Sequence, residues 1–189
     1  MSDVRDPHPL RVEEYRALRA TIQQRGSLRV ILTVATFAVW AVTVLLLSTR
    51  FGLPFFSLVP LIVLVAGFEA VFALHIGVER IGRYIQAHHE PASNGQARWE
   101  ETAMGFRGPG GGANPLFPAV FISATLINLT LGFLFGFDGT EPFSFATQTE
   151  WLPIALLHVV VLIRVVTGSR FAAGQRARDL AEFQRLLKS

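Results

Sequence analysis

Cysteine is absent from this chain. Its absence excludes disulfides, thiolate zinc sites, iron–sulfur clusters and cysteine nucleophiles. Charge is also scarce: 16% of the residues are Asp, Glu, Lys or Arg, whereas soluble domains carry about a quarter. Hydrophobic residues make up 51% of the chain, and 16 of them are Phe. The 189 residues allow one domain or at most two, and their composition is too apolar for an ordinary globular surface in water.

Long apolar runs are what the sequence has instead. About 20 helical residues cross a hydrocarbon core about 30 Å thick. A run in lipid must satisfy its own backbone amides, so each is expected to be a helix. We therefore predict an all-α fold, a four-transmembrane-helix bundle that includes a permanent first anchor rather than a cleaved signal peptide. The predicted spans are residues 30–49, 54–78, 116–137 and 151–167.

Positive charge is distributed unevenly around these spans. Fifteen of the 17 Lys and Arg residues lie in segments 1–29, 79–115 and 168–189, and the exceptions are Arg50 and Arg164. Since Lys and Arg accumulate on the cytoplasmic side of membrane proteins, we expect both termini and the middle loop to be cytoplasmic. This distribution explains the sequence pI of about 10.2 without a nucleic-acid partner. It favours contact with anionic lipids instead.

The two terminal segments are expected to form amphipathic cytoplasmic helices. In segment 1–29, apolar residues recur at helical spacing beside charged ones, and Gly26 with Ser27 offers a hinge into the first span. Segment 168–189 repeats the pattern. Such helices lie on the lipid surface or pack on each other, and we favour the lipid surface. The apolar stripes are Tyr15, Leu18 and Ile22 in the first segment and Leu180, Phe183 and Leu187 in the second.

The middle loop, 79–115, offers two tempting motifs. Its first part, residues 79–90, is expected to continue the second helix. The run His88-His89-Glu90 is the only metal-like cluster, but adjacent histidines on a helix point about 100° apart and no second cluster completes four ligands. The glycine-rich stretch 108–112 lacks the Lys-Ser/Thr of a phosphate-binding loop. We therefore predict no metal site, and a linker at 108–112.

Ionisable side chains within the spans are the clearest candidates for function. Each costs about 2.5–3.5 kcal/mol in lipid even on a mild insertion scale. Counted from the inner ends of the second and fourth spans, Glu69 is level with His158, and His75 with Arg164. We expect a Glu69–His158 hydrogen bond, with Arg164 reaching toward the inner head groups. A haem between His75 and His158 is disfavoured, since they differ by about 9 Å in depth, and no cofactor is expected.

Small residues also recur along two spans, where they let another helix approach closely. The third span adds a polar member, Asn128. These stripes serve packing within one bundle or between subunits, and the pattern does not choose between the two. The stripes are Ala66, Ala70, Ala73 and Gly77 in the second span and Ala124, Asn128, Gly132 and Gly136 in the third.

Segments at the entry to the first span and after the second carry a resemblance. They are residues 14–19 (EYRALR), 79–85 (ERIGRYI) and the pair Trp99-Glu100. Across residues 13–101 the chain resembles a group of small uncharacterised bacterial integral membrane proteins with an IGxYI segment and a Trp-Glu pair. The resemblance implies a bacterial cytoplasmic (inner) membrane protein, and it implies no activity or ligand.

Catalysis is the function class that the sequence favours least. It contains neither a GxSxG elbow nor an HExxH motif. We expect a non-catalytic membrane protein, either a homo-oligomeric scaffold or an accessory subunit of a larger membrane complex. The alternative is a small ion or proton channel or transporter that uses Glu69, His158 and Arg164.

Overall fold

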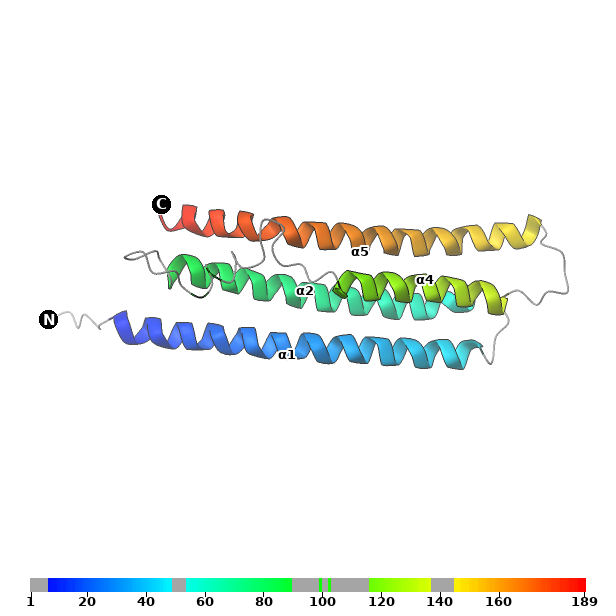
Figure 1. The fold of residues 1–189 in the computed structure, drawn as a ribbon, viewed down its shortest axis with the longest axis horizontal. Coiled ribbons are helices and arrows are strands. Elements are labelled where there is room, and N and C mark those ends of the chain that lie inside the picture. Colours follow the sequence, from blue (N-terminus) through cyan, green and yellow to red (C-terminus); the bar gives the residue numbers. More distant parts are fainter. Residues whose placement is uncertain (1–6, 49–53, 90–98, 100–101, 103–115, 137–144) are drawn as a thin grey trace. The chain divides into compact units, whose positions relative to one another are not determined.

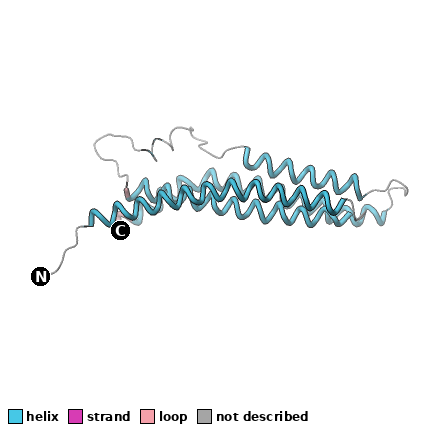
Figure 2. Tube along the Cα trace, turned by 90° about the horizontal axis from the view of Figure 1, so that it is seen from below, coloured by secondary structure: helices cyan, strands magenta, loops and turns pink. Residues whose placement is uncertain are grey.

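The computed structural model describes residues 7–48, 54–89, 99, 102, 116–136 and 145–189. Within these residues the regular elements are helices, and no strand is present (Figures 1 and 2). The order is α1 (Pro7–Ser48), the short 3₁₀ helix η1 (Pro54–Ser57), α2 (Leu58–His88), α4 (Leu116–Gly136) and α5 (Phe145–Leu186). The middle-loop residues 90–98 and 103–115, with the glycine-rich stretch, lie outside the described residues.

Four of these helices are long and apolar enough to cross a membrane. The predictions of an all-α fold and of four helices with the length and composition of membrane spans are therefore confirmed for the described residues. The match is closest for α4, which begins at Leu116 as predicted and ends one residue before the expected boundary. These four helices indicate a multi-pass membrane protein.

The predicted amphipathic terminal helices are not separate elements. Segment 7–29 is the first part of the 42-residue α1, and Gly26 lies inside this helix. Segment 168–186 is the last part of the 42-residue α5. The expected stripe of Tyr15, Leu18 and Ile22 is half-buried against protein. The Tyr15 ring centroid lies 5.7 Å from that of His89, which follows α2, and the preference for the lipid surface stays a prediction.

The chain divides into two compact units. The span unit comprises Val30–Phe72 and Asn114–Arg170. The terminal unit comprises Met1–Arg29, Ala73–Ala113 and Phe171–Ser189. Each unit therefore contains residues of α1, α2 and α5.

An aromatic cluster forms the core of the span unit. Phe68 of α2 is 2% exposed, and its ring centroid lies 5.6 Å from that of Phe72, 5.7 Å from that of Phe117 and 5.4 Å from that of Phe121. Ring pairs at such distances add to the stabilisation from burial. The cluster joins α2 to α4.

Close helix approach in the span unit depends on two glycines. A Cβ on Gly67 of α2 would lie 2.1 Å from Cγ2 of Thr36 on α1. A Cβ on Gly132 of α4 would lie 2.7 Å from the Cβ of Ser57 in η1. No larger residue fits without a shift, so these glycines set how closely α1 packs on α2 and α4 packs on η1.

Ion pairs and ring contacts hold the terminal unit together. Arg80 of α2 pairs with Asp179 of α5 at 3.5 Å, and Arg176 of α5 pairs with Glu79 of α2. The phenol of Tyr84 on α2 donates a 2.7 Å hydrogen bond to the Glu14 carboxylate on α1. In this unit the terminal segments of α1 and α5 thus both pack on the last part of α2.

Candidate functional site

Asn128 is the centre of a buried polar cluster in the span unit. This α4 side chain is 2% exposed. Its Oδ1 accepts a 3.2 Å hydrogen bond from Nε1 of Trp40 on α1. Its Nδ2 lies 2.8 Å from the carbonyl oxygen of Ser57 and 2.9 Å from Nε2 of His158 on α5. One amide side chain therefore connects α4 to α1, to η1 and to α5.

The hydrogen-bond partners of His158 determine its tautomer. Nδ1 lies 2.8 Å from the carbonyl oxygen of Ile154, which can only accept, so Nδ1 carries the proton. Nε2 is then an acceptor, and Asn128 Nδ2 donates to it. Each ring nitrogen of neutral His158 thus has a hydrogen-bond partner. Neither nitrogen is free for a metal ion, a haem iron or a passing proton.

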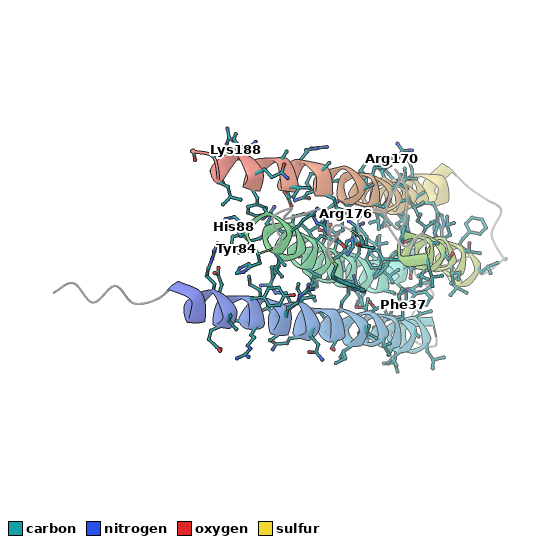
Figure 3. The ribbon with its side chains drawn as sticks, turned by 60° about the vertical axis from the view of Figure 1, so that its left-hand side comes forward. Phe37, Tyr84, His88, Arg170, Arg176 and Lys188 are labelled. Atoms are coloured by element: carbon teal, nitrogen blue, oxygen red, sulfur yellow. The ribbon has the colours of Figure 1, made fainter. Side chains whose placement is uncertain are left out.

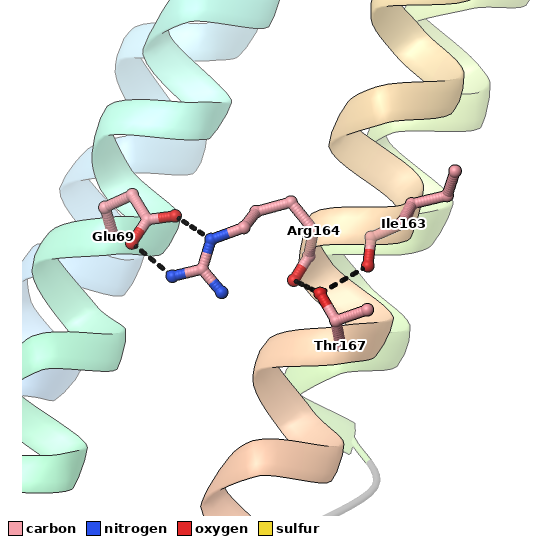
Figure 4. A network of polar contacts seen from close by, with 4 residues as sticks. All are labelled: Glu69, Ile163, Arg164 and Thr167. Atoms are coloured by element: carbon pink, nitrogen blue, oxygen red, sulfur yellow. Dashed lines mark hydrogen bonds and ion pairs between the residues drawn. The ribbon is translucent and has the colours of Figure 1, made fainter.

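Glu69 and Arg164 form a bidentate ion pair in the same unit (Figure 4). Arg164 Nε lies 2.7 Å from Glu69 Oε1, and Arg164 Nη2 donates to Glu69 Oε2 at 2.8 Å. The guanidinium carbon lies 5.2 Å from the ring centroid of Phe72 and 5.7 Å from that of Phe68, within range of a cation–π interaction. This planar two-point pairing is the strongest geometry available to these groups.

The ion pair is not enclosed by the span unit. Both side chains are 43% exposed, on helices whose composition fits a hydrocarbon environment. The Phe rings cover one side of the guanidinium, and the carboxylate uses its two oxygens on Arg164. Because acyl chains cannot solvate the remaining polar atoms, the open side of the Glu69–Arg164 pair is the feature of this unit that most needs an explanation.

The expected Glu69–His158 hydrogen bond is wrong. Glu69 pairs with Arg164 instead, and His158 pairs with Asn128. Counting residues from the span ends compared depth but ignored direction around the helix. Arg164 follows His158 by six residues, which places the two side chains about 120° apart around α5. His158 thus faces α4, whereas Arg164 faces α2, and it pairs with Glu69 rather than reaching toward the head groups.

His75 belongs to the terminal unit and has a different partner. Arg29 Nη1 lies 3.1 Å from His75 Nδ1. A guanidinium has only donors, so Nδ1 accepts and His75 is neutral with its proton on Nε2. His75 thus serves as a hydrogen-bond acceptor between α2 and α1.

The two histidines at the end of α2 take part in a ring cluster of the terminal unit. The ring centroid of His88 lies 4.1 Å from that of Tyr84 in a stacked arrangement, and Phe183 of α5 meets Tyr84 edge-on at 5.6 Å. The ring centroid of His89 lies 5.7 Å from that of Tyr15 on α1. Figure 3 labels Tyr84 and His88 on α2. Across the described ranges, no three His, Asp or Glu side chains are placed to share a metal ion, and Glu90 lies outside those ranges.

The two small-residue stripes prove to be different surfaces. In α4, Ala124 is 4% exposed, and Asn128 and Gly132 are buried, so this stripe packs inside the span unit. Gly136 is the last residue of α4. In α2 the stripe lies outward: Ala66, Ala70 and Ala73 are exposed, and Gly77 is half-buried beneath the guanidinium of Arg25.

Trp40, Ser57 and Thr36 are contact residues that the sequence patterns did not indicate. Trp40 carries one hydrogen-bond donor, its indole N–H, within a run of apolar residues. This is a weak signal that the side chain needs a hydrogen-bond acceptor inside the membrane. Ser57 contributes its backbone carbonyl to Asn128, and a backbone contact leaves no signal in residue type. The Thr36 hydroxyl donates a hydrogen bond to the Leu32 carbonyl of its own helix, and the Thr36 side chain packs against Gly67 of α2.

Comparison with known proteins adds no relative. No family model, curated protein or solved structure matches this chain.

Proposed function

We propose that this chain is a non-catalytic structural protein of the membrane, a homo-oligomeric scaffold or an accessory subunit of a larger membrane complex. The observation that carries this proposal is the pairing of the polar groups at membrane depth. Asn128 and His158 bond each other and their neighbours in a closed network. Glu69 and Arg164 neutralise each other. Such pairing is what fastening helices requires, whereas transport chemistry needs a group that is free to bind and release.

The setting of the protein belongs to the same proposal. The excess of Lys and Arg in segments 1–29, 79–115 and 168–189 supports an orientation with both termini in the cytoplasm. The resemblance given above supports a bacterial inner membrane. Arginines near the inner boundary favour anionic lipids as neighbours.

A small ion or proton channel is the second candidate. It is favoured by one observation, the 43% exposure of Glu69 and Arg164, because a water-filled path in an oligomer would solvate both groups. Against it stands the bidentate geometry, since each charge of this pair satisfies the other rather than a passing ion. His158 also lacks a free ring nitrogen, which a proton relay requires.

Flux measurements with reconstituted protein separate the two candidates. The wild-type chain is placed in liposomes that enclose a pH-sensitive dye, and proton and potassium flux are recorded under an imposed potential. We expect flux equal to that of empty liposomes, and equal rates for Glu69→Gln and His158→Ala. The matched control is Glu13→Gln, because Glu13 is 69% exposed and pairs with Arg16 on α1. Wild-type flux that Glu69→Gln abolishes and Glu13→Gln retains would overturn the structural proposal and establish the channel.

A further inference from the structure

The open side of the Glu69–Arg164 pair leaves hydrogen-bonding capacity unused. A guanidinium has five N–H donors and a carboxylate has about four lone-pair positions. The contacts within the pair use two donors and two acceptors. Arg164 Nη1 lies beside Gly168 and Phe68 within the unit, so the groups left for a partner are the second Nη2 N–H and the remaining lone pairs of the carboxylate. In a membrane these groups need a polar partner that lipid chains do not supply.

The helix surface beside the pair suits close contact with another helix. Ala66 lies one turn before Glu69 on the same side of α2 and is exposed. Ile62, one turn earlier, is 66% exposed. A small residue next to a charged pair lets a second backbone approach closely enough for the charged groups to meet.

We propose that this surface of the span unit is the interface with a second copy of the same chain. We call the surface formed by Ile62, Ala66, Glu69 and Arg164 the pair face. The inference rests on the proposed function and identifies the partner in the proposed assembly as a second copy of this chain. Two pair faces related by a twofold axis meet as four charges of alternating sign, with Arg164 of each copy beside Glu69 of the other.

Charge complementarity selects a second copy as the occupant. The pair face carries one positive and one negative group side by side, so its net charge is zero. A twofold rotation places each group opposite its counter-charge, which is the condition for a self-complementary interface. The unused Nη2 N–H of each guanidinium then meets an unused lone pair of the other carboxylate, and the open side of the pair is completed without water.

Thiol cross-linking tests the contact in a chain that keeps the pair intact. The protein has no cysteine, so each single substitution gives one thiol. Ala66→Cys lies on the pair face and is expected to be joined into a dimer by a short bis-maleimide cross-linker in liposomes, since it lies one turn from the charges that meet beside the twofold axis. Val34→Cys is the control, because Val34 lies on α1 and is 65% exposed. Equal, low cross-linking of the two variants would overturn the inference.

Charge reversal tests the partner. Glu69→Arg gives a pair face with two positive groups, and Arg164→Glu gives one with two negative groups. Each variant alone is expected to lose self-association by at least about tenfold, because like charges then face each other across the interface. Co-expressed with different tags, the two variants are expected to purify together as a heterodimer. The double variant Glu69→Arg/Arg164→Glu restores the pair within one chain and is expected to dimerise again.

The outcomes keep this inference distinct from the proposed function. If the charge-reversed chains fail to accumulate, Ala66→Cys in the otherwise unchanged protein decides. If Ala66→Cys fails to cross-link while the liposomes stay impermeable, the second copy is refuted and the structural role stands. If the dimer forms and conducts ions through Glu69, the structural role fails although the interface is correct.

Discussion

Replacing Asn128 with leucine removes the amide that joins α4 to three other parts of the span unit. Leucine has nearly the same shape but can neither donate to the Ser57 carbonyl and to His158 nor accept from Trp40. Hydrogen bonds between membrane helices are worth about 0.6 kcal/mol each on average, so three bonds give about 2 kcal/mol. Trp40 Nε1 and His158 Nε2 are also left without their partner, which adds up to about 1–3 kcal/mol for each group that stays dry. We expect a total loss of at least about 2 kcal/mol, and of about 4–8 kcal/mol where both groups stay dry.

The loss is measured by unfolding the protein with SDS in detergent micelles, followed by circular dichroism and tryptophan fluorescence. The fluorescence adds a second readout, because Trp40, one of three tryptophans, loses the acceptor of its indole N–H. The matched control is Thr130→Leu. Thr130 lies two residues further along α4, is exposed, and bonds only the Leu126 carbonyl of its own helix at 2.9 Å. We expect that control to change the free energy of unfolding by less than about 0.5 kcal/mol.

Equal stability of Asn128→Leu and Thr130→Leu would refute the role assigned to Asn128. A double variant separates the contact with His158 from the rest. In Asn128→Leu/His158→Leu the loss is expected to be smaller than the sum of the two single losses, because both variants remove the same 2.9 Å contact. Strict additivity would mean that the two side chains do not share a hydrogen bond.

Two further predictions concern close packing and the terminal unit. Gly67→Ala places a Cβ 2.1 Å from Thr36 Cγ2 and is expected to lower stability by about 1–3 kcal/mol, and adding Thr36→Ala should recover part of the loss in the same SDS titration. Phe183→Ala removes the edge contacts with the Tyr84 and His88 rings, so limited proteolysis is expected to cut the end of α5 faster than in Leu186→Ala, whose side chain is 57% exposed.

The fold was predictable because apolar runs report directly on burial in lipid. α4 appears almost as predicted because Pro118 near its start and the glycine-containing end at Gly136 bound a run without charge. The continuity of α1 and α5 from the spans into the terminal segments was not predicted, and the reason is physical. A single glycine, Gly26, costs a helix only about 1 kcal/mol relative to alanine, and residues 7–29 contain no proline after Pro9, so helical hydrogen bonding continues through the change from polar to apolar sequence.

The partners of the polar groups were only partly predictable. The sequence identified Glu69, His158, Arg164 and Asn128 as residues that need partners, since ionisable and amide groups are costly in lipid. It did not show which groups meet, because this depends on direction around each helix and on side-chain length. An arginine side chain reaches several ångströms beyond its own helical turn. The guanidinium of Arg164 therefore pairs with the Glu69 carboxylate, although the residue count placed Glu69 deeper in the membrane than Arg164.

Leucine at Ala66 and at Ala124 tests how the structure separates two stripes that look alike in sequence. Ala124 is 4% exposed, so Ala124→Leu overfills the span unit and is expected to cost about 1–3 kcal/mol in SDS unfolding. Ala66 is exposed, so Ala66→Leu is expected to keep the stability of the monomer within about 0.5 kcal/mol. The same side chain would hold a second copy away from Glu69 and Arg164, and light scattering in mild detergent should then report fewer dimers. If Ala66→Leu unfolds as readily as Ala124→Leu, the outward position of Ala66 is wrong; if it is stable and still fully dimeric, the second copy does not bind at the pair face.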